Sequence, residues 1–218
     1  GEISMTKRIA LTLAGILLVY GSVAFAIKAG IGVLPVDAAI TTLAGLLHMK
    51  VGTFSMIFHG SFFIGQILIE KKKFKKVQFL QIGYIVFGGS ILNFMLYTVL
   101  GGVSFSWYPV RLIVCVLAFF VSAFGCTLVL EMKVIRTPME GFIQMVAEQT
   151  GTTMGRLRQK IDMGLVVLTV VLTLIFHTPW TLREGTVIAA LIFGPFMDFH
   201  SSWIRNVLYG AKKILPEN

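Results

Sequence analysis

Six long apolar segments, separated by shorter polar ones, follow one another along the whole chain. They cover residues 9–27, 51–69, 79–100, 112–130, 161–176 and 186–207. About 20 consecutive apolar residues are enough for a helix to cross the hydrocarbon core of a bilayer. The pattern therefore predicts an all-α membrane protein with six transmembrane helices, forming a single membrane domain over residues 1–218.

The amino-acid composition excludes a soluble domain and a disordered chain. Apolar residues make up 56% of the chain and charged residues 13%, and the mean hydropathy is +0.85. A soluble domain cannot bury so much apolar surface, and disordered chains are poor in apolar residues. The net charge of +9 does not indicate nucleic-acid binding, because the basic residues cluster between apolar segments, where they face anionic lipid.

The distribution of Lys and Arg predicts the orientation. With the N-terminus inside, 15 of these residues fall in inner segments and 4 in outer segments, namely Lys28, Lys50, Arg111 and Arg183. Basic residues are enriched on the cytoplasmic side of membrane proteins. We therefore expect both termini to be cytoplasmic, and the first apolar segment to be a retained helix rather than a cleaved signal peptide.

Two connecting segments, 28–50 and 132–160, are too long and too apolar for ordinary loops. Each contains a proline followed two residues later by an acid, Pro35 with Asp37 and Pro138 with Glu140. Proline suits the first turn of a helix, and an early acid suits its positive end. We expect a short interfacial or re-entrant helix after spans 1 and 4.

The same features indicate an internal duplication. At an offset of 103 residues Pro35, Asp37 and Gly52 correspond to Pro138, Glu140 and Gly155, and at an offset of 105 Gly89, Asn93 and Phe94 correspond to Gly194, Asp198 and Phe199. Each half, about 5–105 and about 106–213, contains three spans. An odd number of spans places the second half in the membrane with the opposite orientation, which predicts two inverted three-helix repeats, an architecture common among secondary transporters.

Three short motifs also resemble a known family. Residues 28–38 read Lys-Ala-Gly-Ile-Gly-Val-Leu-Pro-Val-Asp-Ala, residues 51–55 Val-Gly-Thr-Phe-Ser, and residues 194–198 Gly-Pro-Phe-Met-Asp. Together they resemble the YczE/YyaS/YitT-type bacterial integral membrane proteins. The resemblance implies a multi-pass protein of the bacterial cytoplasmic (inner) membrane that is transporter-like, and it brings no established catalytic residues.

Polar residues inside apolar segments are the candidate substrate-binding residues, because burying them in a membrane is costly. They are Asp198, Asn93, Asp37, Glu140 and His59. We expect the site between segments 88–93 and 194–198, with Asp37 and Glu140 toward opposite mouths and His59 as a proton relay. Each residue also has a structural interpretation. Asp198 could form a salt bridge or hydrogen bond between helices, Asn93 and His59 could form hydrogen bonds in the packing, and Asp37 and Glu140 could be helix N-terminal acids.

No catalytic, cofactor or metal motif is present in the sequence, so we expect no enzyme, no cofactor and no metal. The pattern favours a small-molecule transporter or exporter that works by alternating access, in contact with lipid and possible as a homodimer. Two alternatives remain: a substrate-capturing subunit of a multi-component transporter, and a membrane scaffold that assists biosynthesis.

The charge distribution makes a labelling prediction. In a background without Cys115 and Cys126, single cysteines at Lys73 and Arg158 should be protected from an impermeant thiol reagent in intact cells. Cysteines at Gly102 and Thr178 should react, because the same count places them outside. Labelling at Lys73 before Thr178 would reverse the orientation.

Overall fold

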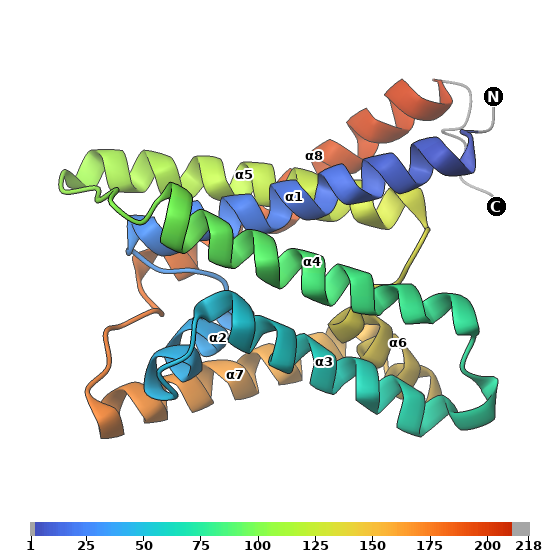
Figure 1. Ribbon diagram of the computed structural model, residues 1–218, viewed down its shortest axis with the longest axis horizontal. Helices are drawn as coiled ribbons and strands as arrows, with labels where there is room; N and C mark the ends of the chain where they lie inside the picture. The colour runs from blue at the N-terminus through green and yellow to red at the C-terminus, as the bar shows by residue number, and fades with distance from the viewer. Residues whose placement is uncertain (1–2, 211–218) are drawn as a thin grey trace.

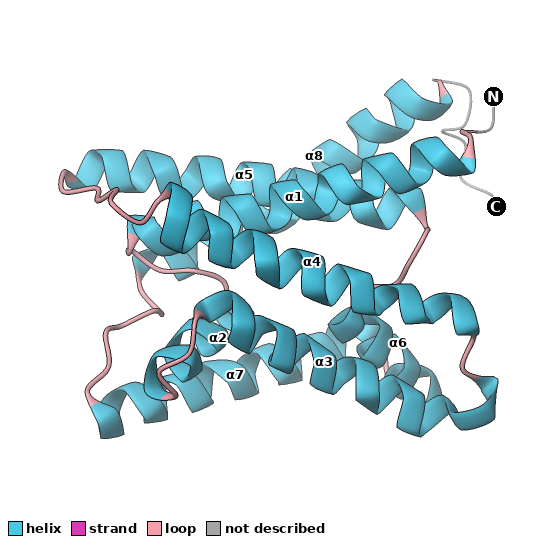
Figure 2. Cartoon of the chain, viewed as in Figure 1, coloured by secondary structure: helices cyan, strands magenta, loops and turns pink. Residues whose placement is uncertain are grey.

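The computed structural model describes residues 3–210, and within this range the chain consists of helices and connections with no strand (Figures 1 and 2). The eight α-helices are α1 (Met5–Ala29), α2 (Pro35–Leu46), α3 (Val51–Glu70), α4 (Leu80–Phe94), α5 (Tyr108–Met132), α6 (Pro138–Thr150), α7 (Met154–Phe176) and α8 (Glu184–Tyr209). Short 3-10 turns η1 (Lys71–Lys73) and η2 (Lys76–Phe79) join α3 to α4, and a π-helical turn η3 (Met95–Val99) extends α4.

Six of the helices in the described range, all but α2 and α6, are long and apolar enough to cross a membrane once the short turns are joined to α3 and α4. This confirms the prediction of a helical protein with six such segments. The two short helices, α2 and α6, occupy the two unusual connecting segments, and each begins at its proline.

Helix α7 departs most from the start that the hydropathy pattern predicts. Residue 161 is the expected start of the fifth long helix, but α7 begins at Met154. The Thr153 hydroxyl caps this end by accepting a hydrogen bond from the Arg156 amide at 3.3 Å. The first three turns contain charged residues, including Arg158 and Asp162, so the hydropathy of this part of the helix is low.

The helices form two layers joined by α4 (Figure 1). One layer holds α1, α5 and α8, and the other holds α2, α3, α6 and α7. In the second layer α2 packs against α7 and α6 packs against α3, so each short helix is seated on a long helix from the other half of the chain. The α3–α4 contact ties the two layers together.

The most extensive helix contact is between α1 and α5, and it depends on glycine. At Gly125 an added Cβ would lie 2.7 Å from the backbone oxygen of Gly15 and 3.0 Å from the backbone nitrogen of Val19. Small residues at such crossings let two helix backbones approach closely, which gives membrane helices much of their packing energy. Gly15 and Gly125 therefore fix the centre of the first layer.

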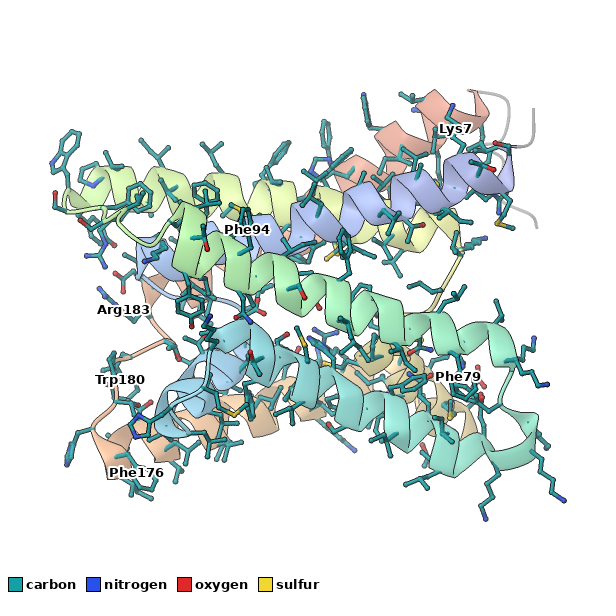
Figure 3. All side chains as sticks on the ribbon, in the orientation of Figure 1. Lys7, Phe79, Phe94, Phe176, Trp180 and Arg183 are labelled. Carbon is teal, nitrogen blue, oxygen red and sulfur yellow. The ribbon has the colours of Figure 1, made fainter. Side chains whose placement is uncertain are left out.

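Large apolar side chains cover the outside of the bundle, as the sticks in Figure 3 illustrate. Leu191 on α8 is 71% exposed and Leu68 on α3 is 67% exposed. In water this surface would be unfavourable, whereas lipid chains solvate it. Lys7 and Phe79 lie toward one end of the bundle in Figure 3, and Trp180 and Arg183 lie at the other.

Helix boundaries repeat with a constant spacing. The first residues of α1 and α5, of α2 and α6, and of α3 and α7 are each 103 positions apart. The residues that directly follow α1 and α5 and cap their C-termini, Gly30 and Lys133, share the left-handed backbone conformation, with φ of 66° and 52°. In Figure 1 the helices of the pairs α1/α5, α3/α7 and α4/α8 run in opposite directions.

The glycine crossing yields a stability prediction. Gly125→Ala should lower the free energy of unfolding in detergent by about 1–3 kcal/mol, because the new methyl group meets backbone atoms that cannot move aside. The matched control is Gly21→Ala on α1, where an added Cβ meets no atom within 4 Å. Thermal unfolding measures both variants, and equal melting temperatures would contradict a backbone contact at this crossing.

Candidate functional site

A cavity of about 190 Å³ lies between the two layers, and all eight α-helices or the residues that cap them contribute to its lining. Its polar lining residues are Tyr20, Asp37, His59, Tyr84, Ser122, Cys126, Thr137, Glu140, Arg158 and Asp162. Pockets for drug-sized ligands are typically about 300–1,000 Å³, so this cavity suits a small molecule.

The N-termini of both short helices line the cavity. Pro35 and Pro138 are the first residues of α2 and α6, and Asp37 and Glu140 are the third. Neither N-terminus has a side-chain cap. The partial positive charge of an uncapped helix N-terminus is therefore directed at the cavity from each of the two halves.

Side-chain and backbone hydrogen bonds hold the segment before α2 in place. The Arg111 guanidinium donates to the backbone oxygens of Ala29 and Gly30, at 2.6 and 2.8 Å. Arg183 donates to the same Gly30 oxygen at 2.8 Å. The Gly185 amide, in the first turn of α8, donates to the Ile31 oxygen at 2.7 Å. These bonds satisfy the exposed carbonyls at the end of α1 and fix the direction in which α2 begins.

A buried amide pair positions α6 in a similar way. The Gln66 side chain of α3 donates to Gln81 of α4 at 3.1 Å and to the backbone oxygen of Pro138 at 2.6 Å. Gln81 donates back to Gln66 at 3.0 Å, and both side chains are fully buried. Since a buried amide without partners is costly, this network specifies where the first turn of α6 must lie.

Three carboxylates and one guanidinium give the cavity its charge. Arg158 of α7 contacts Asp162 at 3.2 Å and Glu140 of α6 at 3.7 Å. Asp37 forms no ion pair within residues 3–210. Burial raises the pKa of the Asp37 carboxyl from 3.8 to about 6, although the nearby positive charge of Arg158 acts in the opposite direction. The excess of carboxylates favours a proton or a cation in the cavity.

His59 contributes an unpaired polar atom. Its Nδ1 is buried and has no hydrogen-bond partner within the described residues. Its ring packs edge-on against Phe58, with centroids 5.5 Å apart. Both His59 and Asp162, which correspond at the 103-residue offset, line the cavity. A buried nitrogen without a partner is unfavourable, and a bound molecule or water would satisfy it.

Aromatic rings form the wall of the cavity on the side of α1 and α4. Tyr20 and Tyr84 pack edge to face, with ring centroids 5.8 Å apart. Gly88 has no side chain, which leaves room for the Tyr20 ring. Ser122 and Cys126 of α5 complete this part of the lining. Tyrosine faces at this position could contact a bound cation.

The structure brings together three of the five residues proposed from the sequence. Asp37, Glu140 and His59 line the cavity, whereas Asn93 and Asp198 lie outside its lining. The Asn93 side chain accepts a hydrogen bond from the Gly52 amide at 2.8 Å and donates to the Thr53 hydroxyl at 3.1 Å. Asp198 is exposed on α8. Of segments 88–93 and 194–198, only Met197 lines the cavity, so the two segments do not meet there.

Sequence reasoning did not propose Arg158, Asp162 or the two tyrosines as site residues. In the sequence Arg158 counts with the basic residues that indicate orientation, because it lies near the expected inner end of a span. An available signal was its spacing from Asp162, since residues four apart share one face of a helix and form ion pairs. Within residues 3–210 no group of three or more His, Cys, Asp or Glu residues could hold a metal ion.

A family of unknown function, DUF6198, has a model that matches residues 6–202. The matched range contains every residue that lines the cavity. The chain belongs to the DUF6198 family. No curated protein and no solved structure matches the chain. Membership in DUF6198 therefore supports no activity, and the function must be argued from the cavity itself.

The raised pKa of Asp37 makes a pH prediction. Between pH 4 and about 6 the folded protein holds a proton on Asp37 that the unfolded chain releases, so stability should fall as the pH rises through this range. Asp37→Asn should remove this part of the pH dependence. Melting temperatures at a series of pH values test it, with Glu148→Gln on the exposed face of α6 as the control. Identical profiles for the wild type and Asp37→Asn would contradict a buried, proton-binding Asp37.

Proposed function

We propose that this DUF6198 protein is a small-molecule transporter in which two inverted three-span repeats expose the central cavity alternately to the two sides of the membrane. The observation that carries the proposal is the meeting of two equivalent helix N-termini, those of α2 and α6, at one cavity lined from both halves. Secondary transporters with inverted repeats bind substrate at such broken or short helices near the repeat interface.

The constant spacing of helix boundaries supports the repeat part of the proposal. Three pairs of helices begin 103 residues apart, and in the pairs α1/α5, α3/α7 and α4/α8 the two helices run in opposite directions (Figure 1). In this proposal α2 and α6 enter the membrane from opposite sides. The end of the bundle near both termini faces the cytoplasm of a bacterial cell, in agreement with the charge distribution.

The charge of the cavity supports a cationic substrate coupled to protons. Three carboxylates face one guanidinium, so the cavity carries an excess of negative charge, and this excess is larger when Asp37 is ionised. A small organic cation such as an amine would bind the ionised form, with its charge near Asp37 and Glu140 and its apolar part against the tyrosines. A proton on Asp37 competes with that cation, and this competition is the physical basis of exchange.

Reconstitution of the purified protein alone in proteoliposomes tests the function. A panel of small amines, guanidines and quaternary ammonium ions is first screened by thermal shift, and stabilising compounds are then offered with an acidic lumen. We expect accumulation driven by the pH difference. Asp37→Asn should abolish the dependence on pH, because the proton-binding group is lost, and Glu140→Gln should weaken binding.

The matched control is Glu148→Gln, an exposed acid on the same helix as Glu140, which should transport as the wild type does. Failure of every cation to stabilise or accumulate would overturn the cation-transport proposal. Unchanged pH-driven uptake by Asp37→Asn would overturn the coupling role of Asp37. Uptake by the protein alone would exclude the need for a separate energising subunit.

A further inference from the structure

The two ends of the bundle differ in how their helices join. At one end α4 packs on α3 and caps its N-terminus, because Asn93 and Tyr97 accept hydrogen bonds from the amides of Gly52 and Val51, at 2.8 and 2.9 Å. The helices also touch through glycine, since a Cβ added to Gly89 would lie 2.6 Å from the backbone oxygen of Gly52. These contacts seal this end between α3 and α4.

The corresponding helices at the other end are apart. In Figure 1 α8 diverges from α7, and within the described residues α8 packs on α5 rather than along α7. Gly155 and Gly194 occupy the positions that match Gly52 and Gly89, and a Cβ added to either would meet no atom within 4 Å. Asp198, which matches Asn93, is exposed on α8. In the part of the chain that the structure describes, the contacts that join α3 to α4 at the first end therefore have no counterpart between α7 and α8 at the second end.

The residues that would meet on closure have complementary charge. At the sealed end the Asn93 side chain donates a hydrogen bond to the Thr53 hydroxyl. At the offsets of 105 and 103 residues, the positions that correspond to Asn93 and Thr53 are Asp198 and Arg156. The amide–hydroxyl pair of the first end is thus replaced by a carboxylate and a guanidinium. Arg156 is exposed in the first turn of α7, where the helix N-terminus also attracts negative charge.

We propose that Asp198 is the gate residue of this end: when α8 closes onto α7, its carboxylate accepts a hydrogen bond from the Gly155 amide and pairs with Arg156. The gate rests on the transport function proposed above. An isolated carboxylate on a membrane-spanning helix is unfavourable, and this docking satisfies it in the closed state. Closure here accompanies release of the Asn93 contacts at the other end, so that one end is open at a time.

Distances between spin labels in nanodiscs test the gate without any substrate. Labels at Met154→Cys and Ser202→Cys, both exposed, report on the α7–α8 end, and labels at Lys50→Cys and Thr98→Cys report on the α3–α4 end. Cys115 and Cys126 are first replaced by Ser. We expect two distance populations for the α7–α8 pair, the shorter one being the closed gate.

Asp198→Leu should reduce the ratio of closed to open gate by about tenfold or more, since it removes a charged hydrogen bond. The exchange Asp198→Arg with Arg156→Asp should restore the short-distance population, a rescue that a merely structural role of Asp198 would not produce. In the Asp198→Leu variant the α3–α4 pair should shift toward its short distance, because the two ends alternate.

A single long distance for the α7–α8 pair under all conditions, or a short-distance population unaffected by Asp198→Leu, would overturn the gate. Failure of the charge exchange to rescue would overturn the pairing with Arg156. The transport proposal fails separately: a working gate in a protein that moves no cation would contradict transport alone. Cation transport with an unaffected gate population in Asp198→Leu would contradict the gate alone.

Discussion

The need to satisfy every backbone polar group at a helix end governs this structure. Within a bilayer no water is available to do so, and each helix that ends inside the protein must find partners there. Arg111 supplies them to the end of α1, and Asn93 and Tyr97 supply them to the start of α3. The starts of α2 and α6 have no side-chain cap, and their first turns lie at the cavity. Backbone amides at the start of α2 and α6 are therefore available to bind a ligand in the cavity.

The exchange of short helices between halves makes the fold interdependent. Since α2 packs more extensively on α7 than on α3, and α6 more extensively on α3 than on α7, each half buries its short helix largely against the other half. The cavity forms at the junction of these exchanged contacts, with a wall from every helix. A change in the packing of one half consequently moves both short helices. The proposed alternating exposure of one site requires such coupling between the two halves.

Much of the helical arrangement could be predicted from the sequence, because hydropathy marks the long helices and a proline followed by an acid marks α2 and α6. The start of α7 could not, since its first turns carry charges that face the cavity and Glu140. For the same reason Arg158 was indistinguishable from a basic residue that sets orientation. Asn93 and Asp198 show another limit: their positions match in sequence, but only packing decides that one is docked and the other exposed. The inverted symmetry itself stays a prediction.

The basic residues at the end far from the termini have a consequence for membrane insertion. Arg111 and Arg183 are bound to backbone oxygens of residues 29 and 30, and Lys50 lies over the Tyr97 ring at 5.5 Å. The donor groups of Arg111 and Arg183 are occupied within the folded protein, whereas Lys71, Lys72 and Lys73 at the other end are exposed. The two ends therefore differ more in the basic groups that they expose to anionic headgroups than the count of residues suggests.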